Sequence, residues 1–342
     1  MKPKNRQLWT LLAIAVLVVS LIALPQVFGS GYVINLMIDT VRWTIFALGF
    51  DLVAGHVSAV SLGQPVFYGI GAYIAALLAP RLGLGFLGGM LLAALLMAAL
   101  ALVAGVAFFR IRRVTFAIGT LGAAIIAQLV ANGTTKLTGG ALCTASVARP
   151  EFALPFTDTV IRIVKPIEYY YLLLPILAVA LLIYWALTTS RIGRAFTTVR
   201  EDEVRASAVG VFPLRYRLLA FAVGSGMTGA LGAFQAHYVT VVCPTEMGLD
   251  ITTTLLIIVF VGGAARLRGV ILGSLLFGLL PRALELVGGQ IITPAYQQIL
   301  YGLILVAVMI FMPDGLDGVM TRVLRRLRRL RRRKPQEAEV QA

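Results

Sequence analysis

The sequence predicts an all-α polytopic membrane protein with about ten transmembrane helices, both termini in the cytoplasm and one short cytoplasmic helical segment. Apolar residues make up 59% of the 342 residues and charged residues only 13%, with a mean hydropathy of +0.90. This apolar content exceeds that of ordinary soluble domains. Apolar runs of about 20 residues recur along the chain, and each is long enough to cross a bilayer. We therefore expect a transmembrane domain over residues 1–321 and a separate tail over 322–342.

The apolar runs predict the individual spans. The first run follows the basic sequence MKPKNR and has features of a signal peptide, but no clear small-x-small cleavage site follows it. We expect it to be retained as a span. The ten predicted spans are approximately 8–24, 32–54, 58–79, 86–109, 114–131, 170–187, 218–239, 249–264, 269–287 and 296–312.

The distribution of basic residues predicts the orientation of the spans. With both termini inside, 23 of the 30 Lys and Arg residues fall in predicted cytoplasmic segments. Such an excess is typical of the cytoplasmic side. The net charge of +15 is then explained by membrane orientation, and nucleic acid is not an expected partner because no RNA-binding pattern is present.

The basic tail at 322–342 predicts an amphipathic helix on the membrane surface. Its sequence VLRRLRRLRRRK places Val323, Leu324, Leu327 and Leu330 at helical spacing among arginines. Such a pattern favours binding to anionic membrane lipid, although a basic tail after a last span also serves orientation alone.

The third predicted span contains an unusual concentration of residues that disturb a helix. Gly63, Pro65, Gly69 and Gly71 fall within little more than two turns. Proline removes a backbone donor, and freed polar groups at membrane depth are tolerated only against protein or a water-filled path. The pattern predicts either an element that lines a transport pathway or a packing kink between close helices.

Few charged side chains lie within the predicted spans. Asp39 and Arg42 are three residues apart in the second span, a spacing that allows them to pair on one helical face. A structural salt bridge is favoured over contact with a solute. Asp51 is expected to reach water near the cytoplasmic end, and His56 and His237 are expected to be isolated interfacial residues.

The long predicted outer loop at 132–169 is a candidate docking surface or gate. Within it, Thr138, Gly139 and Gly140 form the sequence TGG, which either exposes backbone donors to a carboxylate or makes a plain turn.

The two cysteines, Cys143 and Cys243, both fall on the predicted outer side. A disulfide is one interpretation, and two separate thiols in apolar surroundings is the favoured one. Neither cysteine belongs to a metal-ligand cluster in the sequence.

The cytoplasmic loop at 190–217 predicts a short helical element that faces the cytoplasm. Apolar residues including Phe196 share one helical face, and Asp202 is placed to cap a second short helix that ends before Gly210. Pro213 prevents simple continuation of that helix. An element of this kind suits insertion into a cleft of a soluble partner.

The sequence contains no pattern for bond-breaking chemistry. A nucleotide-binding GxxxxGK[ST] loop, an HExxH zinc motif and a nucleophile elbow are all absent. We therefore expect no enzyme activity and no cofactor, and any ATP-driven work would need an ATPase on another polypeptide.

One segment of the cytoplasmic loop at 190–217 resembles the LivM-type permease subunits of branched-chain amino acid ABC importers. The sequence SRIGRAFTTVREDEVRASAVGV is similar to the family pattern S-x-x-G-R-A-x-x-A-[IV]-R-E-[DN]-E-x-A-A-x-x-[LM]-G, in which the segment couples the permease to its ATPases. Arg205 replaces a residue that is usually small. The positions that the resemblance implies for coupling are Arg194, Arg200, Glu201, Asp202, Glu203, Ala206 and Gly210.

Two further segments carry the same resemblance. The third span is similar to the family pattern S-L-G-x-x-x-F-x-G-[IV]-G-A-Y, and the segment LLAFAVGSGMTGALGAFQAHY, which ends at Tyr238, is similar to a later family pattern. The residues of the third span that we predict for the pathway or helix break are Gly63, Pro65, Phe67, Gly69, Gly71 and Tyr73.

The resemblance implies a permease subunit that carries branched-chain amino acids across the bacterial cytoplasmic (inner) membrane. Its implied partners are two ABC ATPase subunits, a LivH-like second permease and a periplasmic or extracellular solute-binding protein. The sequence departs from the family pattern after Gly140 and again at 262–269, so urea, short-chain amides and aromatic acids stay open as alternative solutes. An ion-coupled secondary transporter and a noncatalytic assembly protein are the rival functions.

Overall fold

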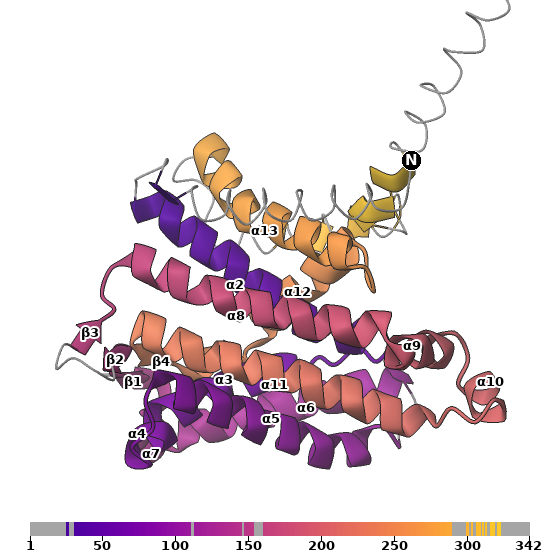
Figure 1. Cartoon of the computed structure of the whole chain (residues 1–342), viewed down its shortest axis with the longest axis horizontal. Helices are drawn as coiled ribbons and strands as arrows, with labels where there is room; N and C mark the ends of the chain where they lie inside the picture. Colours follow the sequence, from indigo (N-terminus) through magenta and orange to yellow (C-terminus); the bar gives the residue numbers. More distant parts are fainter. Residues whose placement is uncertain are drawn as a thin grey trace, which may run out of the picture.

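The computed structural model describes residues 25–26, 31–110, 113–145, 147–153 and 160–288, together with short stretches between 299 and 322. In this part of the chain, long helices lie side by side and four short strands gather at one end of the bundle (Figure 1). We call that end the strand end. The opposite end carries two short helices, α9 and α10, and is called the α9–α10 end.

The first half of the described chain contains three long helices and one interrupted helix. Their bounds, with the short elements between them, are α2 Gly31–Ala54, α3 Gln64–Tyr73, the π-helix η1 Ile74–Leu78, α4 Ala79–Arg81, α5 Phe86–Phe108, α6 Arg113–Gly133, α7 Thr135–Thr138 and the 3-10 helix η2 Gly140–Leu142.

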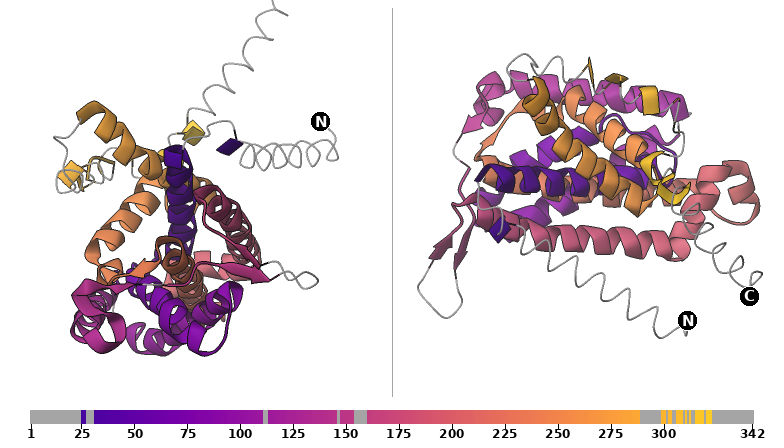
Figure 2. Two further views of the ribbon diagram at one scale, coloured as in Figure 1. Left: turned by 90° about the vertical axis from the view of Figure 1, so that its left-hand side faces the viewer. Right: turned by 90° about the horizontal axis from the view of Figure 1, so that it is seen from above.

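The second half begins with the strands and returns to helix. Its elements are β1 Thr144–Ala145, β2 Glu151–Ala153, β3 Val160–Arg162, α8 Pro166–Thr189, α9 Arg191–Glu201, α10 Glu203–Ala208, α11 Pro213–Val239, β4 Val241–Val242, the 3-10 helix η3 Pro244–Met247, α12 Leu249–Gly262 and α13 Leu267–Gly288. The β2–β3 hairpin extends outward from the helices (Figure 2).

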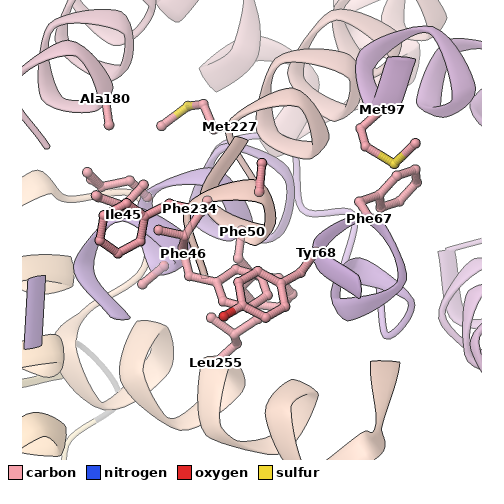
Figure 3. Packing of buried hydrophobic residues seen from close by; sticks show 14 of the residues in the cluster. Ile45, Phe46, Phe50, Phe67, Tyr68, Met97, Ala180, Met227, Phe234 and Leu255 are labelled. Atoms are coloured by element: carbon pink, nitrogen blue, oxygen red, sulfur yellow. The ribbon is translucent and has the colours of Figure 1, made fainter. Parts of the chain in front are cut away.

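Helix α11 is the centre of the bundle. It packs on α5, α3 and α2, while α2 also packs on α8 and α13. Small residues permit this close approach: an added Cβ at Gly71 of α3 would lie 2.3 Å from the carbonyl oxygen of Gly229 in α11. Close contact through small residues is how helices associate in membranes, where lipid supplies no hydrophobic drive between them. Aromatic side chains fill the neighbouring space, including Phe46, Tyr68 and Phe234 (Figure 3).

The third predicted span is only partly helical. We expected a helix over 58–79, whereas α3 begins at Gln64 and residues 58–61 run without regular structure. The backbone of Leu62, which follows this segment, is satisfied by side chains: its N–H donates to Thr120 Oγ1 at 3.0 Å, and Thr252 Oγ1 donates to its carbonyl at 3.0 Å. Irregular backbone at membrane depth requires such protein partners.

Five helices among the described residues are long and apolar enough to cross a membrane. They are α2, α5, the part Thr115–Gly133 of α6, α8 and α11, and α12 and Leu267–Leu280 of α13 are shorter apolar helices. The chain is therefore a multi-pass helical membrane protein. The count of ten spans and the placement of both termini stay predictions. The predicted span at 8–24 lies outside the described residues, and the span at 296–312 and the tail at 322–342 lie mostly outside them.

The strand end is held by a disulfide between Cys143 and Cys243, which are 100 residues apart in sequence. Our favoured interpretation of two separate thiols was wrong, because the chain brings the two Cα atoms to 4.4 Å. Beside the disulfide, β1 and β4 pair antiparallel, with Thr144 opposite Val242. This crosslink ties the loop after α6 to the segment that leads into η3.

Candidate functional site

At the α9–α10 end, α9 lies with one face buried against the bundle. Ser190 caps its first turn by accepting a hydrogen bond from Ile192 N–H at 3.1 Å. Phe196 and Val199 are fully buried, as their predicted position on one helical face requires. The opposite face, which carries Arg194 and Arg200, is exposed.

Asp202 ends α9 and caps α10, as the sequence predicted. Its Oδ1 accepts hydrogen bonds from Val204 N–H at 2.8 Å and Arg205 N–H at 3.1 Å. Glu203 forms an ion pair with Arg217, whose side chain is buried at the start of α11. The chain then turns at Gly210, where φ is +80°, a conformation that suits glycine. These contacts fix the position of α10 relative to α11.

The seven residues predicted for coupling differ in their surroundings. Four of them are exposed: Arg194, Arg200, Glu201 and Gly210. The other three have structural contacts, because Ala206 is buried and because Asp202 and Glu203 hold α10 in place as described above.

No sequence pattern marks the apolar surface at the tip of this element. The side chains of Val204, Val209 and Phe212 are 79%, 71% and 61% exposed. Their spacing follows no single helical face, because the chain turns between them. We call these three residues together with Arg200 and Glu201 the α10 tip surface.

Behind α9 lies a fully buried carboxylate, Asp51 of α2. Tyr184 Oη of α8 donates to its Oδ2 at 2.6 Å, and the backbone N–H of Ala265, between α12 and α13, donates to its Oδ1 at 2.8 Å. We expected Asp51 to reach water, and that prediction was wrong because α8 and the α12–α13 turn close over the end of α2. One carboxylate thus joins three segments that are far apart in sequence.

His56 extends this arrangement toward α9. Its Nε2 lies 2.9 Å from Tyr184 Oη and 3.7 Å from Asp51 Oδ2, and its ring lies 6.5 Å from the ring of Phe196. Burial lowers the pKa of His56, with the Asp51 carboxylate opposing that shift. A neutral ring that donates from Nε2 to Tyr184 Oη leaves the single tyrosine proton for Asp51. His56 is therefore not the isolated interfacial residue that we expected.

The residues that we predicted for the helix break lie mainly in close packing. An added Cβ at Gly63 would lie 2.6 Å from the Thr120 carbonyl oxygen, and one at Gly69 would meet the Met247 side chain. Phe67 packs edge-on against Phe221 at 5.3 Å, and Pro65 lies in the first turn of α3. Tyr73 is buried, and no described residue forms a hydrogen bond with its hydroxyl.

A cavity of about 210 Å³ lies between α2, α3, η3 and α12. The side chains that line it are Arg42, Trp43, Phe46, Tyr68, Glu246 and Ile251. Of these six residues, only Arg42 was predicted from the sequence to make a specific contact, its pairing with Asp39. Tyr68 lies between Gly63 and Gly69, which we predicted to line the pathway or break the helix. No local sequence pattern marks Glu246.

Two opposite charges line the cavity without forming an ion pair with each other. Arg42 pairs with Asp39 at 3.0 Å, as its spacing predicted, and its Nη1 lies 3.5 Å from Tyr68 Oη. Glu246 Oε2 is buried and has no hydrogen-bond partner among the residues that the structure describes. Burial raises the pKa of the Glu246 carboxyl to about 7, and Arg42 opposes that shift. The carboxyl therefore lacks the contacts that would normally stabilise its charge.

The TGG sequence of the outer loop forms a closed turn. Thr138 Oγ1 donates to the Ala131 carbonyl at 2.5 Å and accepts from Gly140 N–H at 3.2 Å, and Gly139 N–H donates to the Thr135 carbonyl at 3.0 Å. Both glycine donors are thus used within the turn.

His237 at the end of α11 is likewise not isolated. Its Nδ1 lies 2.6 Å from the Ala148 carbonyl, and its ring packs edge-on against Phe86 at 5.1 Å. This corrects the expectation of an interfacial histidine without partners.

Comparison with known proteins gives a match over most of the chain. Residues 32–309 match the model of the family described as branched-chain amino acid transport system / permease component. The matched range includes the cavity, the Asp51 contacts and the α9–α10 element.

Curated relatives of two kinds are similar to the chain. The high-affinity branched-chain amino acid transport system permease proteins LivM of Salmonella typhimurium and Escherichia coli K12 are each 29% identical, over 90% and 89% of this chain and 74% of their own length. The LivH permease protein of Escherichia coli K12 is 22% identical over 81% of this chain and 91% of its own length. Among solved structures, PsaBC from Streptococcus pneumoniae in complex with Fab is 18% identical, covering 82% of this chain and 91% of its own chain with a TM-score of 0.40.

Proposed function

Because the chain belongs to the permease component family of branched-chain amino acid transport systems, we propose that it is the LivM-like membrane subunit of an ABC importer for branched-chain amino acids. The greater similarity to LivM than to LivH, 29% against 22% identity, supports the assignment to the LivM-like position. The proposed location is the bacterial cytoplasmic membrane.

The proposed importer contains further subunits. A LivH-like permease pairs with this chain to enclose a path, two ATPase subunits bind on the cytoplasmic side, and a solute-binding protein delivers the solute to the strand end. Support for separate ATPases comes from the sequence, which holds no nucleotide-binding motif. Urea, short-chain amides and aromatic acids are the alternative solutes.

The observation that carries this proposal is the α9–α10 element, which is held to the bundle by the buried face of α9 and by the Glu203–Arg217 ion pair and is exposed on its outer face. It projects from one end of the bundle (Figure 1), and the α10 tip surface combines charges with exposed apolar side chains. Exposed apolar residues grouped with polar neighbours mark a protein interaction site. In our proposal, ATP-driven closure of the ATPases moves this element.

The Asp51 contacts provide a route from α9 into the bundle. Helix α8 continues into α9 after Ser190, and its Tyr184 is hydrogen-bonded to Asp51. A displacement of α9 would therefore act on α2 and on the α12–α13 turn together. An equilibrium between two bundle arrangements can be biased by ATP through such a connection.

Reconstitution tests the transport activity. The chain is co-expressed with a LivH-like permease, the ATPases and the binding protein from its own genome, and uptake of radiolabelled leucine into proteoliposomes is measured. We expect uptake that requires both ATP and the binding protein. Uptake driven by an ion gradient without ATP would instead establish a secondary transporter, and ATP-driven uptake of urea or an amide but no amino acid would replace the proposed solute.

A second experiment tests the coupling surface. The variant Arg200→Glu with Val204→Asp should lose stable association with the ATPases and lower leucine uptake by about tenfold or more. The first substitution reverses a charge of the α10 tip surface, and the second replaces an apolar side chain with a charged one. Arg162→Glu, a charge reversal at an exposed arginine of the opposite, strand end, is the control for ATPase association, which it should leave unchanged. Unchanged ATPase association in the double variant would show that α10 is not the docking element. Glu203 is a poor choice for this test because it also holds α10 to Arg217.

A further inference from the structure

The cavity between α2 and η3 has the chemistry of a site for a free amino acid. We infer that it binds the zwitterionic head of an aliphatic α-amino acid, with Arg42 facing the carboxylate and Glu246 facing the ammonium group. This inference deepens the proposed function and rests on it, since it assigns the residues of this chain that contact the solute during passage.

The charged groups are the first part of the argument. Arg42 and Glu246 line one cavity, yet no ion pair joins them. A buried carboxylate oxygen without a partner is uncommon in a folded protein and calls for an explanation. An ammonium group in the cavity would supply hydrogen-bond donors to the Glu246 carboxylate, which belongs to the cavity lining. Arg42 presents several N–H donors, which suit a carboxylate.

The apolar walls are the second part. Trp43, Phe46 and Ile251 provide hydrocarbon and aromatic surface, and Phe46 stacks on Tyr68 with 4.9 Å between ring centroids (Figure 3). The volume of about 210 Å³ is below the range of about 300 to 1,000 Å³ that is typical for drug-sized ligands. A small aliphatic side chain fits both the size and the surface.

The same features separate the candidate solutes. Urea and short-chain amides carry no charge, so they would leave the separation of Arg42 from Glu246 unexplained. An aromatic acid without an amino group has no partner for Glu246. An aliphatic amino acid uses both charges and the apolar wall. The disulfide also supports the position of Glu246 in the site. Cys243 lies three residues before Glu246, and its bond to Cys143 holds η3 beside the cavity.

Equilibrium binding to the purified transporter complex, without the binding protein, tests the inference. Radiolabelled leucine is the probe, and two competitors each lack one charge: 4-methylpentanoate lacks the ammonium group and leucinamide lacks the carboxylate. Glu246→Gln should weaken leucine binding by about tenfold or more and leave competition by 4-methylpentanoate unchanged. Arg42→Gln should weaken leucine and 4-methylpentanoate and spare leucinamide. Glu151→Gln makes the same change at an exposed carboxylate away from the cavity and should leave all three unchanged.

The outcomes are distinct from those of the uptake experiment. If the wild-type transporter imports leucine but Glu246→Gln binds leucine as tightly as Glu151→Gln does, only the cavity assignment is overturned. An equal loss of leucine and 4-methylpentanoate in Glu246→Gln also overturns it, since the ammonium contact would then not be the cause. If the wild-type transporter imports no α-amino acid at all, the proposed function fails and the zwitterion site fails with it.

Discussion

Asp51 and Glu246 both hold carboxylate oxygens away from solvent, and they differ in what surrounds those oxygens. Asp51 accepts hydrogen bonds from Tyr184 and from the Ala265 backbone. Glu246, which lines a cavity, keeps one buried oxygen that has no partner in the described part of the chain. A carboxylate whose partners come from the protein stabilises an arrangement of segments, whereas one without them is prepared to accept a donor from elsewhere. The two carboxylates therefore mark a structural junction and a candidate binding site.

The largest effect is expected from Asp51→Ala. The change leaves the Tyr184 hydroxyl and the Ala265 N–H buried without an acceptor, which should lower the free energy of unfolding by about 3 kcal/mol or more. Thermal unfolding of the complex in detergent measures this. Glu246→Gln is the matched comparison and should leave stability nearly unchanged, because it removes an uncompensated charge. Equal destabilisation by the two variants would remove the distinction between the two carboxylates.

The next largest effect is expected from loss of the Cys143–Cys243 disulfide, which lies near Glu246 in the chain. Cys243→Ser should lower stability by about 2 to 4 kcal/mol, because the crosslink closes a long loop. It should also weaken leucine binding, since η3 is less firmly held beside the cavity. Cys143→Ser should reproduce both effects, and treatment of the wild type with a reductant should do the same. Leucine affinity that is insensitive to all three changes would show that the crosslink does not position Glu246.

A smaller effect is expected from Tyr184→Phe, which removes one hydroxyl from the Asp51 junction and keeps the ring. The loss of its hydrogen bond should cost about 1 to 2 kcal/mol of stability. If the junction also transmits movement from α9, ATP hydrolysis should be stimulated less by the loaded binding protein while ATPase association persists. Tyr171→Phe, a conservative change elsewhere on α8, is the control. Normal stimulation in Tyr184→Phe would confine the junction to a structural role.

The smallest effect concerns pH. The Glu246 carboxyl has a pKa of about 7, so it gains a proton as pH falls through that value and loses its attraction for an ammonium group. The other titratable groups that face it, Arg42, Tyr68 and Tyr73, ordinarily titrate far above neutral pH. Leucine should therefore bind about tenfold more weakly at pH 6 than at pH 8. Glu246→Gln should flatten that dependence; a profile that persists in this variant would assign the titration to another group.

The sequence predicted the local features of this protein because each depends on neighbours along the chain. Apolar runs indicated the helices, the capping side chain of Asp202 marked the boundary between α9 and α10, and the spacing of Asp39 and Arg42 indicated their ion pair. The family resemblance, too, was carried by continuous segments such as 190–217.

Only the tertiary structure decided which distant side chains meet. Tyr184 and Asp51 are 133 residues apart, Cys143 and Cys243 are 100 apart, and Glu246 reaches the cavity through a turn that no periodicity marks. The irregular segment before α3 was also hidden, because its backbone is satisfied by Thr120 and Thr252 from other helices. Hydropathy reports where a segment resides, but the partners of a buried polar group are set by how helices pack, and that packing depends on the whole chain at once.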